Sequence, residues 1–155
     1  MKQLLTVPCI CLLLVSCTNQ ERGAIDPDAL AKKMFDAVRN NAEAKSELLL
    51  PDKGTFRKIE TDLGREPSDL EAAYSQFMAK ANTSFTQANA KSAAWSEATF
   101  TRSNYTESKL DKLPVARITI KFMAVNEPLK MECSAIKFNN RWYYYGDIVW
   151  IDKPE

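Results

Sequence analysis

The apolar side chains of this chain change their spacing once, close to Ala94. Before that point they recur every three or four positions, which is the spacing of amphipathic helices. The longest such stripe lies in 68–92 and consists of Leu70, Tyr74, Phe77, Met78, Ala81, Phe85 and Ala88. We interpret it as a helix face turned to the core and not as a ligand-binding box, because every amphipathic helix shows this pattern. After Ala94, apolar and polar residues alternate, which predicts that strands follow the helices.

Two shorter helices are expected near the start of the helical half. Asp26 followed by Pro27 is typical of an N-cap and a first helical residue, and predicts a helix over 27–41. A second, short helix is expected within 42–50, because Pro51 cannot continue it.

Two further helices are expected before the strands begin. The stretch 52–63 carries its apolar side chains on one helical face, with Gly64 as the C-cap. These side chains are Phe56, Ile59 and Leu63. In the long helix over 68–92, Ser68 and Glu71 have the spacing of a capping box.

Four strands are expected in the second half, and short turns join the last three. The predicted strands are 95–106, 115–125, 129–138 and 141–151. Asn126-Glu127 separates the second strand from the third, and Asn139-Asn140 separates the third from the fourth. Asparagine tolerates the positive φ that a two-residue hairpin turn requires, so both connections are interpreted as hairpins.

The first of these turns predicts a register. With Val125 opposite Pro128, eight apolar side chains share one face of the second and third strands. They are Ile118, Ile120, Phe122, Ala124, Leu129, Met131, Cys133 and Ala135. On the other face this register pairs Lys121 with Glu132, which have opposite charges.

The second hairpin predicts two candidate sites. With Phe138 opposite Arg141, the apolar face continues onto Trp142 and Tyr144, which are the candidate pocket residues. The opposite face carries a group of mostly aromatic side chains that we interpret as a candidate interface with a second copy or another envelope protein. This group is Ile136, Phe138, Arg141, Tyr143 and Tyr145. The alternative is that a loop, the N-terminal tether or the strand at 95–106 covers this group within one subunit.

Helices followed by an antiparallel meander predict an α+β domain, with the N-terminal helices packed on one face of a curved antiparallel β-sheet. The long helix before the sheet resembles the nuclear transport factor 2-like (cystatin-like) cone. The closing segment Phe138–Ile148, with its asparagine turn followed by Trp-Tyr, resembles the end of small bacterial envelope lipoproteins of that fold. The resemblance covers residues 27–151, and we expect a single α+β domain over 27–155. Domains of the resembled fold include enzymes, ligand binders and dimerisation modules.

The N-terminus resembles that of bacterial lipoproteins. Residues 1–16 combine Lys2 with an apolar run too short to span a bilayer, as in a signal peptide. The run ends Leu14-Val15-Ser16-Cys17, which is similar to a lipobox, so the resemblance implies cleavage before Cys17 and a lipid on its thiol. We expect residues 17–26 to form a tether. Thr18, in place of the aspartate associated with inner-membrane retention, favours an outer membrane facing the periplasm.

Composition excludes several kinds of chemistry. The chain has no histidine, which removes Ser-His-Asp and Cys-His catalysis and histidine zinc sites. It has 21 basic and 20 acidic side chains, so charge gives no attraction to nucleic acid. Cys133 has no histidine to activate it and is expected to be a buried, inert thiol. No motif predicts a metal or a cofactor.

Two functions remain open. The first is a non-enzymatic envelope lipoprotein that binds a protein partner. The second is a protein with a pocket for a small apolar ligand or, less in keeping with the missing histidine, an enzyme in which Tyr144 and Asp147 transfer protons. A filled interior favours the first function, and a deep pocket with converging polar groups favours the second.

Overall fold

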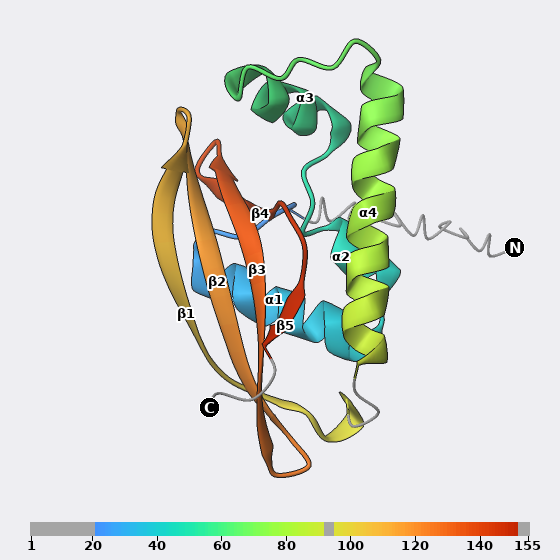
Figure 1. Ribbon diagram of the computed structural model, residues 1–155, viewed down its shortest axis with the longest axis vertical. Helices are drawn as coiled ribbons and strands as arrows, with labels where there is room; N and C mark the ends of the chain where they lie inside the picture. Colours follow the sequence, from blue (N-terminus) through green and yellow to red (C-terminus); the bar gives the residue numbers. More distant parts are fainter. Residues whose placement is uncertain (1–20, 92–94, 152–155) are drawn as a thin grey trace, which may run out of the picture.

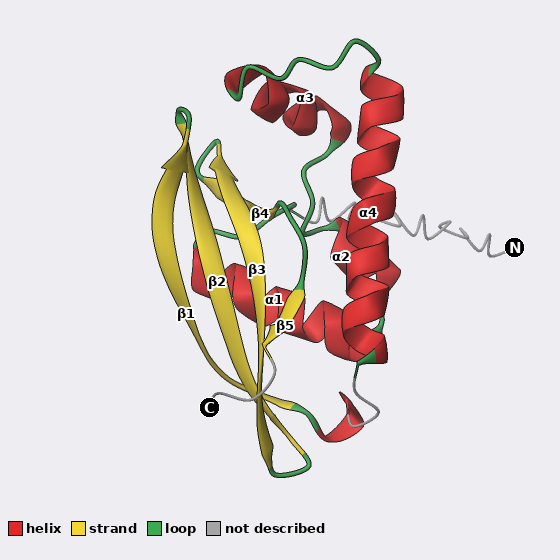
Figure 2. Cartoon of the chain, in the orientation of Figure 1, coloured by secondary structure: helices red, strands yellow, loops and turns green. Residues whose placement is uncertain are grey.

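The computed structural model describes residues 21–91 and 95–151, and shows helices followed by an open, curved antiparallel sheet (Figures 1 and 2). The helices are α1 (Pro27–Asn40), α2 (Glu43–Glu47), α3 (Lys53–Asp62) and α4 (Leu70–Ala90). The strands are β1 (Thr99–Leu110), β2 (Leu113–Ala124), β3 (Glu127–Phe138), β4 (Arg141–Tyr144) and β5 (Val149–Ile151). The α+β class and the order of the elements are those expected from the change of spacing near Ala94.

The helix starts follow from acidic caps. Asp26 accepts a hydrogen bond from the Ala29 amide (2.6 Å) at the start of α1, and Asp52 accepts one from the Thr55 amide (2.7 Å) at the start of α3. Asn41 ends α1 in the left-handed conformation, with φ 46°. The expected helices over 27–41 and 52–63 are therefore confirmed, and the short helix within 42–50 is confirmed as α2.

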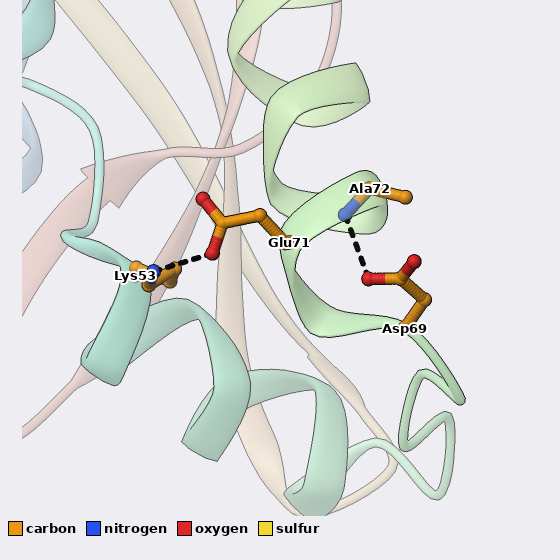
Figure 3. Close-up of polar contacts among 4 residues, drawn as sticks. All are labelled: Lys53, Asp69, Glu71 and Ala72. Atoms are coloured by element: carbon orange, nitrogen blue, oxygen red, sulfur yellow. Dashed lines mark hydrogen bonds and ion pairs between the residues drawn. The ribbon is translucent and has the colours of Figure 1, made fainter.

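The capping box predicted for α4 is wrong. Asp69 is the N-cap and accepts from the Ala72 amide at 3.0 Å, so the helix starts one residue later than Ser68 would place it (Figure 3). Glu71 points away from the helix start and binds Lys53 on α3 at 2.6 Å (Figure 3). A carboxylate is a stronger acceptor than a hydroxyl at this position, and it leaves the Glu71 side chain free for a contact between helices.

The strands pair in the order β1-β2-β3-β4, and β5 pairs with β3 beside β4. The second hairpin is as expected: Phe138 lies opposite Arg141, and both turn residues have positive φ, 48° at Asn139 and 59° at Asn140.

The register predicted between β2 and β3 is wrong, because the turn lies one residue earlier in the chain than expected. Ala124 lies opposite Glu127, so the turn residues are Val125 (φ 48°) and Asn126 (φ 64°). Lys121 consequently faces Lys130 and not Glu132. The eight apolar side chains nevertheless keep their common face, because moving the turn by one residue changes the pairing by two, and the side-chain period of a strand is also two.

Two strand boundaries also differ from the expected ones. Residues 95–97 form a 3₁₀ turn, and β1 then continues to Leu110 as a largely exposed edge strand. The run 141–151 is split into β4 and β5, which both pair with the same edge of β3. Between them, Gly146 passes so close to Ser134 that an added Cβ would lie 3.0 Å from the Ser134 Cβ atom. A side chain at this crossing would therefore require the backbone to shift.

The main core lies between α1, the C-terminal half of α4 and one face of the sheet. Phe35 of α1 and Trp95 pack around Phe122 of β2, with ring centroids 5.4 Å and 5.3 Å from it. Phe85 of α4 packs edge-on against Tyr144, 5.2 Å between centroids. Along α4 the predicted stripe is fully buried only at Ala81, Phe85 and Ala88, with Ser84 beside them. Its N-terminal part is half-buried and faces α3.

A second, smaller core covers part of the opposite sheet face. Ile59 and Leu63 of α3 pack on Ile136 and Tyr143, and Leu113 completes the buried group. Helices therefore cover both sides of the β4 end of the sheet, and not the single face expected from the sequence. Successive side chains of a strand point to opposite faces of the sheet. Every second side chain of β3 and β4 belongs to the main core, so the side chains between them point to the opposite face, which α3 covers.

Residues 22–24, which we expect within the tether, instead bind the outer edge of β4. The amide and carbonyl of Ala24 exchange hydrogen bonds with Trp142, both 2.8 Å, and the Gly23 amide donates to the Leu48 carbonyl at 2.7 Å. The Leu49 carbonyl accepts from the Tyr144 amide at 2.9 Å. The edge of β4 is thus covered by the chain itself, which removes an unpaired strand edge.

Candidate functional site

The two candidate pocket residues lie within the core. Trp142 and Tyr144 are buried, and Tyr144 is 0% exposed. Both belong to the main cluster of buried side chains, which fills the space between the helices and the sheet. We therefore find these two residues in the packing of the interior and not on the wall of an open cavity.

The Tyr144 and Asp147 side chains are not arranged for proton transfer. Asp147 is on the surface and pairs with Lys80 at 3.2 Å. Burial raises the pKa of Tyr144 well above its ordinary value. The Tyr144 hydroxyl forms no hydrogen bond of acceptable geometry with the described residues. A hydroxyl with a raised pKa and no base beside it is a poor acid at neutral pH.

The five candidate interface residues do not form an open surface. Ile136 and Tyr143 are buried, because Ile59 and Leu63 of α3 cover them. Phe138 and Tyr145 are half-buried against the same group, and Arg141 pairs with Glu21. The chain itself covers these residues: α3, which is not among the expected covering segments, packs on the apolar ones, and Glu21 of the expected tether pairs with Arg141.

Cys133 is a buried thiol, as expected. Its sulfur lies 3.2 Å from the Met34 sulfur on α1, and burial raises its pKa to about 12. At neutral pH this cysteine is protonated and out of contact with solvent, so it cannot act as a nucleophile.

A groove that sequence reasoning missed lies between α3 and α4. It has a volume of 540 Å³, and its apolar wall is formed by Phe56 of α3, Phe77 of α4 and Tyr145 beyond β4. The ring centroids of Phe77 lie 5.0 Å from Phe56 and 5.5 Å from Tyr145. Three segments distant in the sequence thus contribute one aromatic wall, and the volume lies within the range of small-molecule and peptide sites.

Charged side chains line the groove above the aromatic wall. The Tyr145 hydroxyl donates to the Glu60 carboxylate, which is only 14% exposed and lies 3.5 Å from the Arg65 guanidinium. Burial raises the pKa of Tyr145 far above its ordinary value, and the Glu60 charge acts in the same direction. Lys80 of α4 also lines the groove and pairs with Asp147 at 3.2 Å. The groove therefore combines apolar contact area with hydrogen-bonding groups of both charges.

The sequence contains no signal for this groove. It places Phe56 and Phe77 in the stripes of two separate helices, and Tyr145 in the candidate interface on the sheet. Nothing in their spacing predicts that α3 folds back beside α4, because that depends on contacts across the loop from 63 to 69. The half-buried state of the N-terminal part of α4 is the structural sign that another element covers it incompletely.

Other expectations concern the termini. Residues 1–16, Cys17 and Thr18 lie outside the described residues, and so does the end of the domain after 151. None of the helices within residues 21–91 and 95–151 combines the length and the apolar character that a membrane crossing requires. Within the same residues, no three acidic or cysteine side chains gather where they could hold a metal ion.

Comparison of the chain with protein-family models, with curated proteins and with solved structures gives no match.

Proposed function

We propose that this protein is a lipoprotein of a bacterial envelope, anchored through Cys17, whose domain is a non-enzymatic binding module of the nuclear transport factor 2-like (cystatin-like) kind. Anchoring is supported by the Leu14-Val15-Ser16-Cys17 motif after an apolar run. The nuclear transport factor 2-like fold is supported by the order of the elements, a long helix followed by a curved antiparallel meander. We place the anchor in the outer membrane because Thr18, and not an aspartate, follows Cys17.

One observation carries the binding role: the interior is filled, whereas an aromatic groove is open between α3 and α4. A filled interior leaves no room for substrate between helices and sheet. The groove offers aromatic area with polar groups around it, which is the composition of protein and peptide contacts. We infer that a segment of an envelope protein binds there.

Anchoring is tested by the Cys17→Ala variant. The wild-type protein is expected in the membrane fraction and labelled by a palmitate analogue. The variant is expected to be unlabelled and either unprocessed or released, because the lipid is its only proposed anchor. Wild-type retention and labelling of the variant would contradict the proposal.

The groove is tested by photo-crosslinking in intact cells at two glutamines of the same helix. Gln76 lines the groove, whereas Gln87 is exposed eleven residues further along α4 and is the matched control. We expect adducts of defined mass from position 76 and none from position 87. Equal adducts at both positions, or none at either, would contradict a binding role for the groove.

A small apolar ligand is the second candidate occupant, favoured by the volume of the groove. It predicts a bound mass below about 1 kDa in native mass spectrometry of protein purified from membranes, and no protein adduct at position 76.

A further inference from the structure

The chain is bound to the domain almost from the first described residue. The Arg22 guanidinium donates to the Glu47 carbonyl at 2.9 Å, and the Lys33 ammonium donates to the Gly23 carbonyl at 3.0 Å. Ala24 forms two backbone hydrogen bonds with Trp142 and is buried. The start of the domain is therefore fixed at the edge of β4, and no free segment remains after Arg22.

This leaves a very short reach for a lipid on Cys17. Gly23 lies six positions after Cys17, and a fully extended chain spans at most about 3.6 Å per residue. Gly23 therefore lies within about 22 Å of Cys17, the residue proposed to carry the lipid. That distance is shorter than the domain, since β3 alone has 12 residues, or roughly 40 Å.

The surface beside this point has the composition of a lipid-contacting one. Ile25, directly after the bound residue Ala24, is 70% exposed, the most exposed of the large apolar side chains among the described residues. Lys33 and Lys45 are exposed and line one hollow with Leu48. Two acidic residues, Glu21 and Asp36, line the same hollow, and each of them is paired with another basic side chain, Arg141 and Lys32 respectively. Among the described residues, neither lysine forms an ion pair, whereas nearby Asp36 is paired with Lys32 at 3.7 Å.

We propose that the surface formed by Ile25, Lys33 and Lys45 rests on the bilayer that holds the Cys17 lipid, with anionic headgroups against the two lysines. This inference rests on the proposed lipidation. Each lysine near an anionic surface contributes about 1 kcal/mol, and Ile25 adds apolar contact at the interface. Figure 1 shows the β2–β3 turn at the far end of the sheet from α3 and β4. The proposed orientation leaves this turn in water.

The experiment uses the lipidated full chain in vesicles of phosphatidylethanolamine and phosphatidylglycerol. A fluorophore is attached at Ile25→Cys or, as the matched control, at Val125→Cys in the β2–β3 turn, another exposed apolar residue. Cys133 is buried and remains unlabelled. We expect acrylamide to quench the label at position 25 at least threefold less than the label at position 125.

Two further variants test the reason for this protection. A flexible insertion of twenty glycine and serine residues after Asn19 is expected to raise quenching at position 25 to the level at 125. The double variant Lys33→Gln, Lys45→Gln is expected to raise acrylamide quenching at position 25 at least twofold while the protein stays bound to the vesicles. Equal quenching at both positions in vesicle-bound protein overturns the inference alone. Protein that carries no lipid and does not bind the vesicles overturns the proposed anchoring as well.

Discussion

Val125 adopts a backbone conformation that β-branched residues rarely take. It is the first residue of the β2–β3 turn, with φ 48°, and its side chain is 54% exposed. Asparagine tolerates this conformation, and little packing is lost because Val125 is exposed. We therefore expect Val125→Asn to raise the free energy of unfolding by roughly 0.5–1 kcal/mol, measured by urea denaturation. Asn126→Val in the same turn is the control and is expected to lower it; a stabilising effect of both would contradict the interpretation.

Cys133 makes the stability depend on pH in the alkaline range. Its pKa is about 12 in the folded protein and near 9 in the unfolded chain. Below pH 9 both states keep the proton, and above it only the unfolded state loses the proton. We therefore expect the free energy of unfolding to fall by about 1 kcal/mol between pH 8 and pH 10 through this group. The decrease in unfolding free energy between pH 8 and pH 10 should be smaller in Cys133→Ala, as measured by urea unfolding at each pH. Parallel pH profiles for the two proteins would refute this account.

At the scale of the element, the start of α4 depends on Asp69. Its carboxylate satisfies the Ala72 amide, whereas Glu71 and Lys53 form an exposed pair across two helices (Figure 3). Asp69→Ala is expected to cost about 1 kcal/mol of unfolding free energy. Glu71→Gln is expected to cost less than about 0.5 kcal/mol, because exposed pairs are screened by water. Ser68→Ala is the matched control and should leave the free energy of unfolding unchanged. A larger loss from Ser68→Ala than from Asp69→Ala would show that Ser68, and not Asp69, caps the helix.

At the scale of the whole molecule, the segment before α1 is part of the domain. Ala24 covers the edge of β4 with two backbone hydrogen bonds to Trp142, and the Gly23 amide donates a third to the Leu48 carbonyl. A soluble domain starting at Glu21 is expected to be monomeric. One starting at Asp26 is expected to lose roughly 2–3 kcal/mol of unfolding free energy and to associate at high concentration, because that edge becomes free. Urea unfolding and sedimentation measure both effects.

A point variant separates the contact from the length of the chain. Gly23 has φ 74°, and an added Cβ would lie 2.7 Å from the Trp142 carbonyl oxygen. Gly23→Ala in the longer domain is therefore expected to reproduce most of the loss. Equal stability of all three proteins would show that the segment does not stabilise the domain.

The sequence predicted the features that depend on neighbours along the chain. The cap at Asp26, the common face of Phe56, Ile59 and Leu63 on α3, the Asn139-Asn140 turn and the common face of the strands are all confirmed. Each follows from hydrogen bonds within four residues or from the fixed periods of helix and strand. The partner of Lys121 was wrong, although its face was right, because moving a turn by one residue changes pairing without changing faces.

Only the tertiary structure decided which element packs on which face of the sheet and of the helices. Ile136 and Tyr143 have the alternation of an outer face, yet Ile59 and Leu63 bury them. Ala24 is bound to Trp142 across 118 positions of the chain, and the groove joins Phe56, Phe77 and Tyr145. A periodic pattern states which side chains share a face of an element. It contains no information on which distant element comes to lie against that face, because that choice is made by packing energies summed over the whole domain.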